Sequence, residues 1–421
     1  MRTGIGSFFV YTCLVSILAG CVARKIKPGE YRPIPVQEQY RIFESFPEVS
    51  LVGFADTFSL SREIPEIERE WLAVLYFERE FDVLALGGST FDVWLSMDLI
   101  LNQGMSEENI RQARLRGMPI GYQTSEMETL FSWVRETRNR SEPFYVVGFG
   151  QEVASSYGWR NQFLIRTFAE VLRSYGARGS VSEIEGALSP LLKLKKCKES
   201  GFPKNEEVVA EIKKSIISLE SLVSEVEGVV QEKFPGLSHA KVLRSLSAHF
   251  QSALDLCEAR GLPQKRVELE SGLVLRAKSE WSRSGKVVVL GDFRSLRNSK
   301  GTLGSSLKSK MGEQMFVIAT LPIQGELIAR TSPPKKVQIK GNETPIQEIF
   351  QNLDAPAFVP FFSLSPRAKR WAPIFQKGSL LLEGVSESVE CSKEVDGLLV
   401  FPKVSHSGKW YLDHLQFKKE W

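Results

Sequence analysis

The stretch Val52–Glu63, VGFADTFSLSRE, decides the fold that we predict for this chain. An apolar run comes first, a polar loop follows, and a helix begins near its end. In α/β proteins, functional groups gather in the loops that follow the carboxyl ends of strands. This loop offers Asp56, Ser59, Arg62 and Glu63, which makes it a candidate active-site loop.

Short apolar runs of the same kind alternate with helical patterns along most of the chain. Runs such as VVVL at 287–290 indicate strands covered on both faces. Helices are predicted at Ile67–Glu80 and Glu126–Arg138. The alternation predicts an α/β fold with a central, mostly parallel sheet flanked by helices. The predicted strands are Val49–Ala55, Val83–Gly87, Phe144–Phe149, Val287–Gly291, Met315–Thr320, Ala357–Phe362 and Gly397–Phe401.

One segment, residues 205–261, contains no predicted strand. Two apolar stripes with steps of three or four residues flank the turn Phe234–Ser238, which predicts an inserted antiparallel helical hairpin. Packing on its own domain is favoured over a coiled coil with a partner. Cys257 falls on the second apolar stripe and is predicted to be a core residue.

Composition is that of a globular protein, with 421 residues, 43% apolar residues and 25% charged residues. The net charge of +4 does not suggest a nucleic-acid surface. There is no CxxC pair, so a zinc site is unsupported, and we predict no cofactor.

Residues 1–20 have the features of a secretion signal. Arg2 is followed by an uncharged apolar run at Ile5–Leu18, which is too short to span a bilayer comfortably. The sequence Leu18-Ala19-Gly20-Cys21 resembles a bacterial lipobox, which implies cleavage before Cys21 and acylation at that residue. The alternative is an ordinary signal peptide that contains a cysteine. We therefore expect a lipid-anchored envelope protein, in the outer membrane or at the cell surface rather than in the inner membrane, because Val22 is not an aspartate.

Residues 21–47 are interpreted as a tether between the lipid and a domain at 48–421. Residues 22–46 of this tether have little periodicity and contain three prolines. Arg24, Lys25 and Lys27 lie close to the predicted lipid, where they either contact anionic headgroups or remain solvated.

Over residues 48–402 the chain resembles the erythromycin esterase-like proteins. VGFADTFSLSRE is similar to the family pattern V-G-x-G-E-x-x-H-G-x-x-E, and VLALGGSTFDVWLSMDLIL at 83–101 is similar to V-x-A-L-E-G-x-x-x-D. The run from Gly121 to Arg135, KVVVLGDFRSLR at 286–297 and the segment at 301–320 resemble later family motifs in the same order.

The resemblance implies an ester hydrolase whose histidines and glutamates converge at strand ends. Here the equivalent positions hold Asp56, Ser59, Gly87, Asp292 and Ser295. The chain has only four histidines, and none precedes residue 239. His239 is predicted to lie at the surface near a helix cap and His249 in the core, while His406 and His414 lie in the C-terminal tail.

Asp56 and Asp292 remain weak catalytic candidates. Two close carboxylates could share a proton, bind a metal or act as acid and base. The simpler alternative is that each caps a helix or pairs with Arg62 or Arg294. The predicted pocket lining comprises Asp56, Ser59, Arg62, Glu63, Gly87, Arg294 and Ser295.

Three functional hypotheses follow. The first is a lipid-anchored pseudoenzyme that binds an unidentified small molecule or an envelope protein. The second is a hydrolase that uses Asp56 and Asp292. The third is a haem-binding lipoprotein, for which Met118 and Tyr122 are the only candidate axial ligands near the predicted pocket.

Overall fold

The computed structural model describes residues 34–36, 48–56, 61–102, 125–138, 140–150, 160–198, 206–258, 263–329, 335–341, 343–361, 378–382 and 385–405. Several residues singled out above lie outside these ranges. They are Cys21 with the rest of the signal, Arg24, Lys25, Lys27, Ser59, Met118, Tyr122, His406 and His414.

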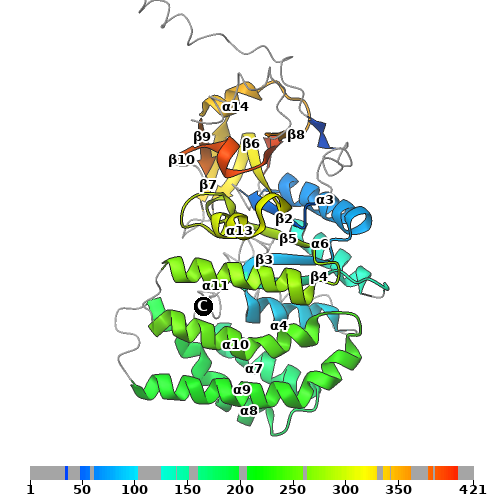
Figure 1. Ribbon diagram of the computed structural model, residues 1–421, viewed down its shortest axis with the longest axis vertical. Helices are drawn as coiled ribbons and strands as arrows, with labels where there is room; N and C mark the ends of the chain where they lie inside the picture. Colours follow the sequence, from blue (N-terminus) through cyan, green and yellow to red (C-terminus); the bar gives the residue numbers. More distant parts are fainter. Residues whose placement is uncertain are drawn as a thin grey trace, which may run out of the picture. The chain divides into compact units, whose positions relative to one another are not determined.

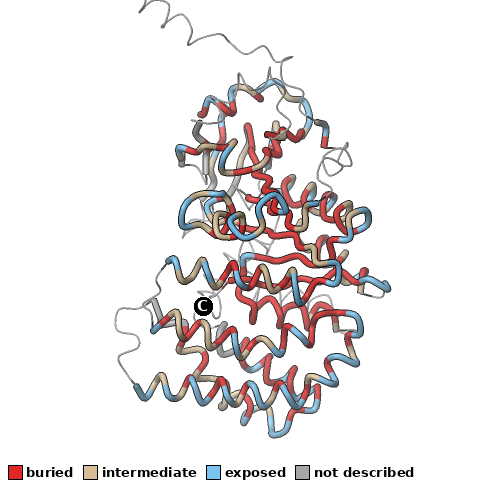
Figure 2. Tube along the Cα trace, in the orientation of Figure 1, coloured by how far each residue is buried: buried red, intermediate tan, exposed pale blue. Residues whose placement is uncertain are grey.

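Among the described residues, six parallel strands form the centre of the sheet, in the order β11-β6-β2-β5-β3-β4 (Figure 1). They confirm the predicted α/β class. The strands are almost entirely buried in Figure 2, as expected when helices cover both faces of a sheet. Their bounds are β2 Leu51–Asp56, β3 Val83–Ser89, β4 Tyr145–Gly150, β5 Val287–Asp292, β6 Met315–Ala329 and β11 Gly397–Val404.

Antiparallel strands extend the sheet beyond this centre. The strand predicted near residue 357 is β8 (Ala357–Pro360), which runs antiparallel to β11, and β1 (Ile34–Pro35) pairs in turn with β8. β6 is longer than predicted, because its second half pairs with β7 (Lys335–Lys340). Gly325 lies in that half with a φ of +138°, and a Cβ there would come within 1.8 Å of the Val404 oxygen, so only glycine fits.

Helices cover the two faces of the sheet. On one face lies α3 (Glu63–Arg79), whose Trp71 ring packs edge-to-face on Phe54 with centroids 6.1 Å apart. On the other face lies α12 (Phe293–Leu296), whose Leu296 side chain lies 3.8 Å from the Cβ position of Gly53. The remaining helices are α6 Ser125–Thr137, α7 Arg160–Ser174, α8 Val181–Leu188, η4 Ser189–Lys198, α11 Pro263–Arg276, η5 Ala277–Trp281, α13 Leu303–Met311, η6 Gly312–Gln314, α14 Pro345–Ile349 and α16 Cys391–Glu394.

The helical hairpin is present as predicted. It consists of α9 (Glu206–Lys233) and α10 (His239–Glu258), which pack against each other (Figure 1). The hairpin packs on its own domain, because α10 also contacts α4 (Thr90–Leu101). Within this contact the indole Nε1 of Trp94 donates to the carbonyl oxygen of His239 at 3.0 Å.

A separate two-stranded sheet forms from β9 (Gly378–Leu382) and β10 (Val385–Val389). In the part of the chain that the structure describes, no helix is both long enough and apolar enough to cross a membrane.

Candidate functional site

The carboxyl ends of β2 and β5 lie at a reversal of the strand order. From β2 the chain continues through α3 to β3 on one side, whereas from β5 it continues through α12 and α13 to β6 on the other. A ligand site is expected at such a switch point. Here Asp56 and Asp292 are the last residues of β2 and β5 and are register partners on these adjacent parallel strands.

Asp56 contacts the third strand of this group. Its Oδ1 accepts a hydrogen bond of 3.1 Å from the Thr320 hydroxyl of β6, and Thr320 is fully buried. The Asp56 carboxylate therefore helps to join β2 to β6.

Asp292 is the N-cap of α12. Its Oδ1 accepts from the backbone N–H of Ser295 at 3.0 Å, and its Oδ2 accepts from the Ser295 hydroxyl at 2.7 Å. This is the capping role that the sequence left open for Asp292. Ser295 thus acts as the partner of a capping carboxylate, and no histidine is seen beside it among the described side chains.

The charged residues of the predicted pocket lining have partners of their own. Arg294 Nε donates to Glu387 of β10 at 2.7 Å. Arg62 makes a 3.5 Å pair with Glu66 one turn along α3. The Glu63 carboxylate accepts from the backbone N–H and the hydroxyl of Ser405, at 2.8 and 2.6 Å. The Arg294 contact joins α12 to β10, and the Glu63 contact joins the start of α3 to the residue after β11, whereas the Arg62 pair lies within the start of α3.

Gly87 is the position at which the family pattern has a glutamate. It is exposed, although every other residue of β3 is buried. On β5, a Cβ at Gly291 would lie 3.2 Å from Leu296 and 3.7 Å from the Phe149 ring of β4. Apolar side chains therefore fill the space over Gly291.

The two described histidines lie in α10 and not at the carboxyl edge. The predicted surface position of His239 is wrong, because its exposed fraction is 0%. Its Nε2 lies 2.9 Å from Asp98 Oδ1, and its Nδ1 lies 2.7 Å from the hydroxyl of Tyr145. Tyr145 is the first residue of β4, so this histidine lies near the amino edge of the sheet.

The contacts of His239 are made to buried groups on both sides of its ring. Burial, and then the Asp98 charge, raise the pKa of Tyr145 well above its ordinary value, so its hydroxyl keeps its proton beside Nδ1. On the other side of the ring, Nε2 lies against Asp98, which also accepts from the Tyr175 hydroxyl at 2.6 Å. The group is a buried network of hydrogen bonds that joins the hairpin to α4, to β4 and to Tyr175, the residue that follows α7.

His249 is a core residue, as predicted. Its exposed fraction is 3%, and neither ring nitrogen has a hydrogen-bond partner. Burial lowers the pKa of His249 to about 4, so the ring is neutral near pH 7.

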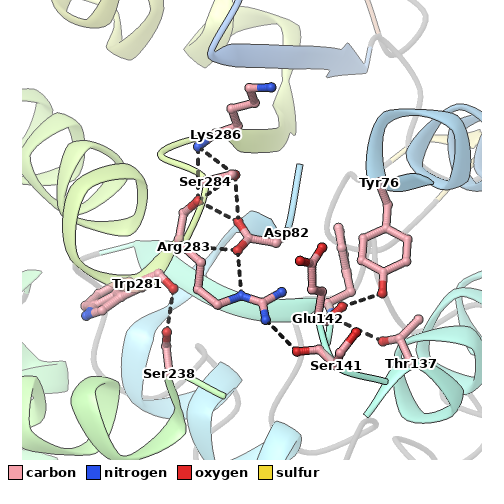
Figure 3. Close-up of polar contacts among 12 residues, drawn as sticks. Tyr76, Asp82, Thr137, Ser141, Glu142, Ser238, Trp281, Arg283, Ser284 and Lys286 are labelled. Atoms are coloured by element: carbon pink, nitrogen blue, oxygen red, sulfur yellow. Dashed lines mark hydrogen bonds and ion pairs between the residues drawn. The ribbon is translucent and has the colours of Figure 1, made fainter. Parts of the chain in front are cut away.

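A second polar group, which the sequence did not predict, is centred on Asp82 just before β3 (Figure 3). Its Oδ1 accepts from the Ser282 hydroxyl at 2.5 Å, and its Oδ2 accepts from the Arg283 backbone N–H at 2.8 Å. Arg283 in turn donates to the carbonyl oxygen of Ser141 at 2.9 Å. The group joins the loops before β3, β4 and β5 at the amino edge, opposite to the edge where α/β proteins bind ligands.

The side chains of the described ranges contain no group of three or more His, Cys, Asp or Glu residues arranged to hold a metal ion. Asp56 and Asp292 therefore have no further protein ligand of these types within that part of the chain.

Solved structures resemble this fold along nearly the whole chain. A histidine-to-asparagine variant of the erythromycin esterase EreC, in its open conformation, matches with a TM-score of 0.54 at 13% identity, over 90% of this chain and 98% of that one. This chain therefore shares its fold with that esterase. A Bacillus cereus protein matches with a TM-score of 0.59 at 15% identity, over 89% and 99% of the two chains. A succinoglycan biosynthesis protein matches with a TM-score of 0.62 at 12% identity, over 91% and 94%.

No family model matches the sequence, and no curated protein matches it either. At these low identities the three structures establish the fold and leave the activity to be argued from the site.

Proposed function

We propose that this chain is a lipid-anchored envelope protein whose esterase-like domain no longer hydrolyses esters and instead binds a small molecule or an envelope component. The likeness to an erythromycin esterase supports the scaffold. The lipobox-like sequence before Cys21 supports the anchor. The side chains at the carboxyl edge support the loss of hydrolysis.

The observation that carries the proposal is the arrangement of Asp292 and Ser295. General-base hydrolysis needs a group that can hold and deprotonate a water molecule beside the substrate. Both oxygens of Asp292 accept hydrogen bonds from Ser295, in a capping arrangement that stabilises α12. The equivalent family positions hold histidines, and both described histidines of this chain are buried in α10.

The cysteines support export from the cytoplasm. Cys257 is disulfide-bonded, whereas Cys391 is a free, buried thiol. Disulfides persist in oxidising compartments such as the periplasm and the cell surface, and they are rare in the cytosol. The Cys257 disulfide therefore agrees with a location in the cell envelope.

An esterase assay on the purified, lipidated chain tests the loss of hydrolysis. p-Nitrophenyl acetate, p-nitrophenyl butyrate and a macrolide lactone are the substrates, with and without divalent metal ions, and an active erythromycin esterase is the positive control. We expect no turnover above the buffer rate, and no difference between the wild type and the Asp56→Asn and Asp292→Asn variants.

Turnover that disappears in either variant would instead support a hydrolase. The register pairing of Asp56 with Asp292 makes those two carboxylates the residues to test first. Turnover that both variants retain would also contradict the proposal and would place the catalytic groups elsewhere.

Lipidation is tested separately by expressing the full chain with a labelled fatty acid. The wild type is expected to incorporate the label and to sediment with membranes. The Cys21→Ala variant is expected to do neither, whereas an ordinary signal peptide would release an unlabelled soluble protein in both cases.

A further inference from the structure

The N-terminal segment joins the sheet before the domain proper begins. β1 pairs antiparallel with β8, with Ile34 opposite Phe358 and Pro35 opposite Ala357. The backbone N–H of Val36 donates to the Pro356 oxygen at 3.3 Å, and the Val36 side chain is only 3% exposed. The segment interpreted as a tether therefore contains a short strand at the outer edge of the sheet.

We propose that this β1–β8 edge faces the lipid bilayer and that the β4 edge, with the helical hairpin, faces away from it. The inference rests on the proposed acylation of Cys21. The partner of the β1–β8 edge is an anionic phospholipid surface.

The length of the connecting chain favours this orientation. Twelve residues, 22–33, separate Cys21 from Ile34. The thirteen steps from Cys21 to Ile34, fully extended at roughly 3.5 Å each, reach about 45 Å. The β1 and β4 edges are seven strand spacings apart, or about 34 Å at about 4.8 Å each. A reversed domain would require a nearly extended connection, which is entropically unfavourable.

The charge of the connecting chain favours the same orientation. Residues 22–33 contain four basic residues and one acidic residue, Glu30. A basic residue near an anionic membrane surface contributes about 1 kcal/mol of attraction. The connection is therefore drawn toward the headgroups, which brings the strand that follows it close to the same surface.

The opposite edge then carries a surface available to other molecules. α4 packs on β4, and α10 of the hairpin packs on α4. In the proposed orientation, the exposed side of α9 projects away from the bilayer.

Fluorescence energy transfer on the lipidated full chain tests this orientation. Single labels are placed at Ala355→Cys, an exposed site just before β8, and at Ser221→Cys, an exposed site on α9. The free native thiol, Cys391, is fully buried. The acceptor is a headgroup-labelled lipid in vesicles of phosphatidylethanolamine and phosphatidylglycerol. We expect transfer from residue 355 to be about twofold greater than from residue 221.

Equal transfer from the two sites, or greater transfer from residue 221, would overturn the orientation. A chain that fails to float with the vesicles would instead refute the proposed anchoring, so the two failures are distinguishable.

Val36→Asp should release β1 and reduce the difference in energy transfer between residues 355 and 221, whereas Val36→Ile should preserve that difference. If Val36→Asp does not fold, a Gly-Ser insertion between Arg32 and Pro33 lengthens the connection and should reduce the difference in the same way. A difference that persists after lengthening would also contradict the proposal.

Discussion

Asp56 and Asp292 lie side by side in register at the ends of β2 and β5, yet their carboxylates bind different partners. Asp56 accepts from Thr320, and Asp292 accepts from Ser295. A pair that shared a proton would need its oxygens directed at each other. The hydrogen bonds instead direct Asp292 into its own helix, which favours a structural role for this residue.

The capping role of Asp292 predicts how the two substitutions at this position differ. Asp292→Ala removes the acceptor of the Ser295 N–H and should lower the free energy of unfolding by about 1 kcal/mol. Asp292→Asn retains a capping oxygen and should change the free energy of unfolding by only a few tenths of a kcal/mol. Urea unfolding followed by circular dichroism measures both. If Asp292→Asn costs as much as Asp292→Ala, the charge and not the cap is the important feature.

The Asp82 group predicts a larger effect at the opposite edge of the sheet. Asp82→Ala leaves the Ser282 hydroxyl and the Arg283 N–H without their acceptor in a buried site, so the free energy of unfolding should fall by about 2–4 kcal/mol. Glu66→Ala is the matched control, because the Arg62–Glu66 pair is exposed and should contribute less than about 0.5 kcal/mol. If the two variants lose similar amounts of free energy of unfolding, the hydrogen bonds of Asp82 contribute no more to stability than an exposed ion pair does.

The strands and the hairpin could be predicted because their signals are local. Runs such as VVVL are apolar enough to identify buried strands, and the stripe on α10 follows from helical spacing alone. The second half of β6 was missed because it pairs with the polar strand β7, whose only apolar residues are Val337 and Ile339. The order of the strands, and thus the pairing of Asp56 with Asp292, depends on contacts between residues more than 200 positions apart.

The polar groups inside the fold could not be predicted for the same reason. His239 follows a turn and begins a helix, which is usually a surface position. Its burial depends on Trp94 and Asp98, which approach from α4 more than 140 positions earlier. The available signal was the pair of aspartates, Asp92 and Asp98, inside the strongly apolar run TFDVWLSMDLIL, since a buried charge in a helix requires a partner.

The buried hydrogen bonds around Asp98 predict that two substitutions lower the free energy of unfolding by different amounts. Asp98→Ala leaves His239 and Tyr175 without their shared acceptor, and should lower the free energy of unfolding by about 3–5 kcal/mol. Tyr175→Phe removes a single hydrogen bond and should cost about 1 kcal/mol. Hydrogen exchange should show that Asp98→Ala exposes the amides of α10 before those of β2. Equal protection of the two elements would mean that Asp98 does not hold the hairpin in place.

The cysteines predict a disulfide that stabilises the hairpin region. Reduction should lower the free energy of unfolding by about 2–4 kcal/mol, because Cys257 is disulfide-bonded. Cys391 is a free thiol and is therefore not part of this disulfide. Burial, and then the nearby Glu394 charge, raise the pKa of the Cys391 thiol to about 12, so it should resist alkylation in the folded protein. Non-reducing peptide mapping tests the pairing, and a linkage through Cys391 would contradict it.

His249 predicts a loss of stability in mild acid. Burial lowers its pKa from 6.5 to about 4, so above pH 6.5 the ring is neutral in both the folded and the unfolded chain. As the pH falls from 6.5 toward 4, the unfolded chain binds a proton that the folded chain does not, and the free energy of unfolding decreases by up to about 3 kcal/mol.

His249→Leu removes this dependence and, near pH 7.5, should stabilise the fold by about 1–3 kcal/mol, because two unpartnered ring nitrogens disappear. His249→Gln removes the titration but keeps polar atoms in the core, so it should flatten the pH dependence without that gain. Urea unfolding of all three proteins at pH 5 and pH 7.5 separates these effects. Carboxylates titrate in each protein alike, so their contribution cancels when the pH dependence of a variant is compared with that of the wild type. An unchanged difference between the two pH values in His249→Leu would show that another group causes the acid sensitivity.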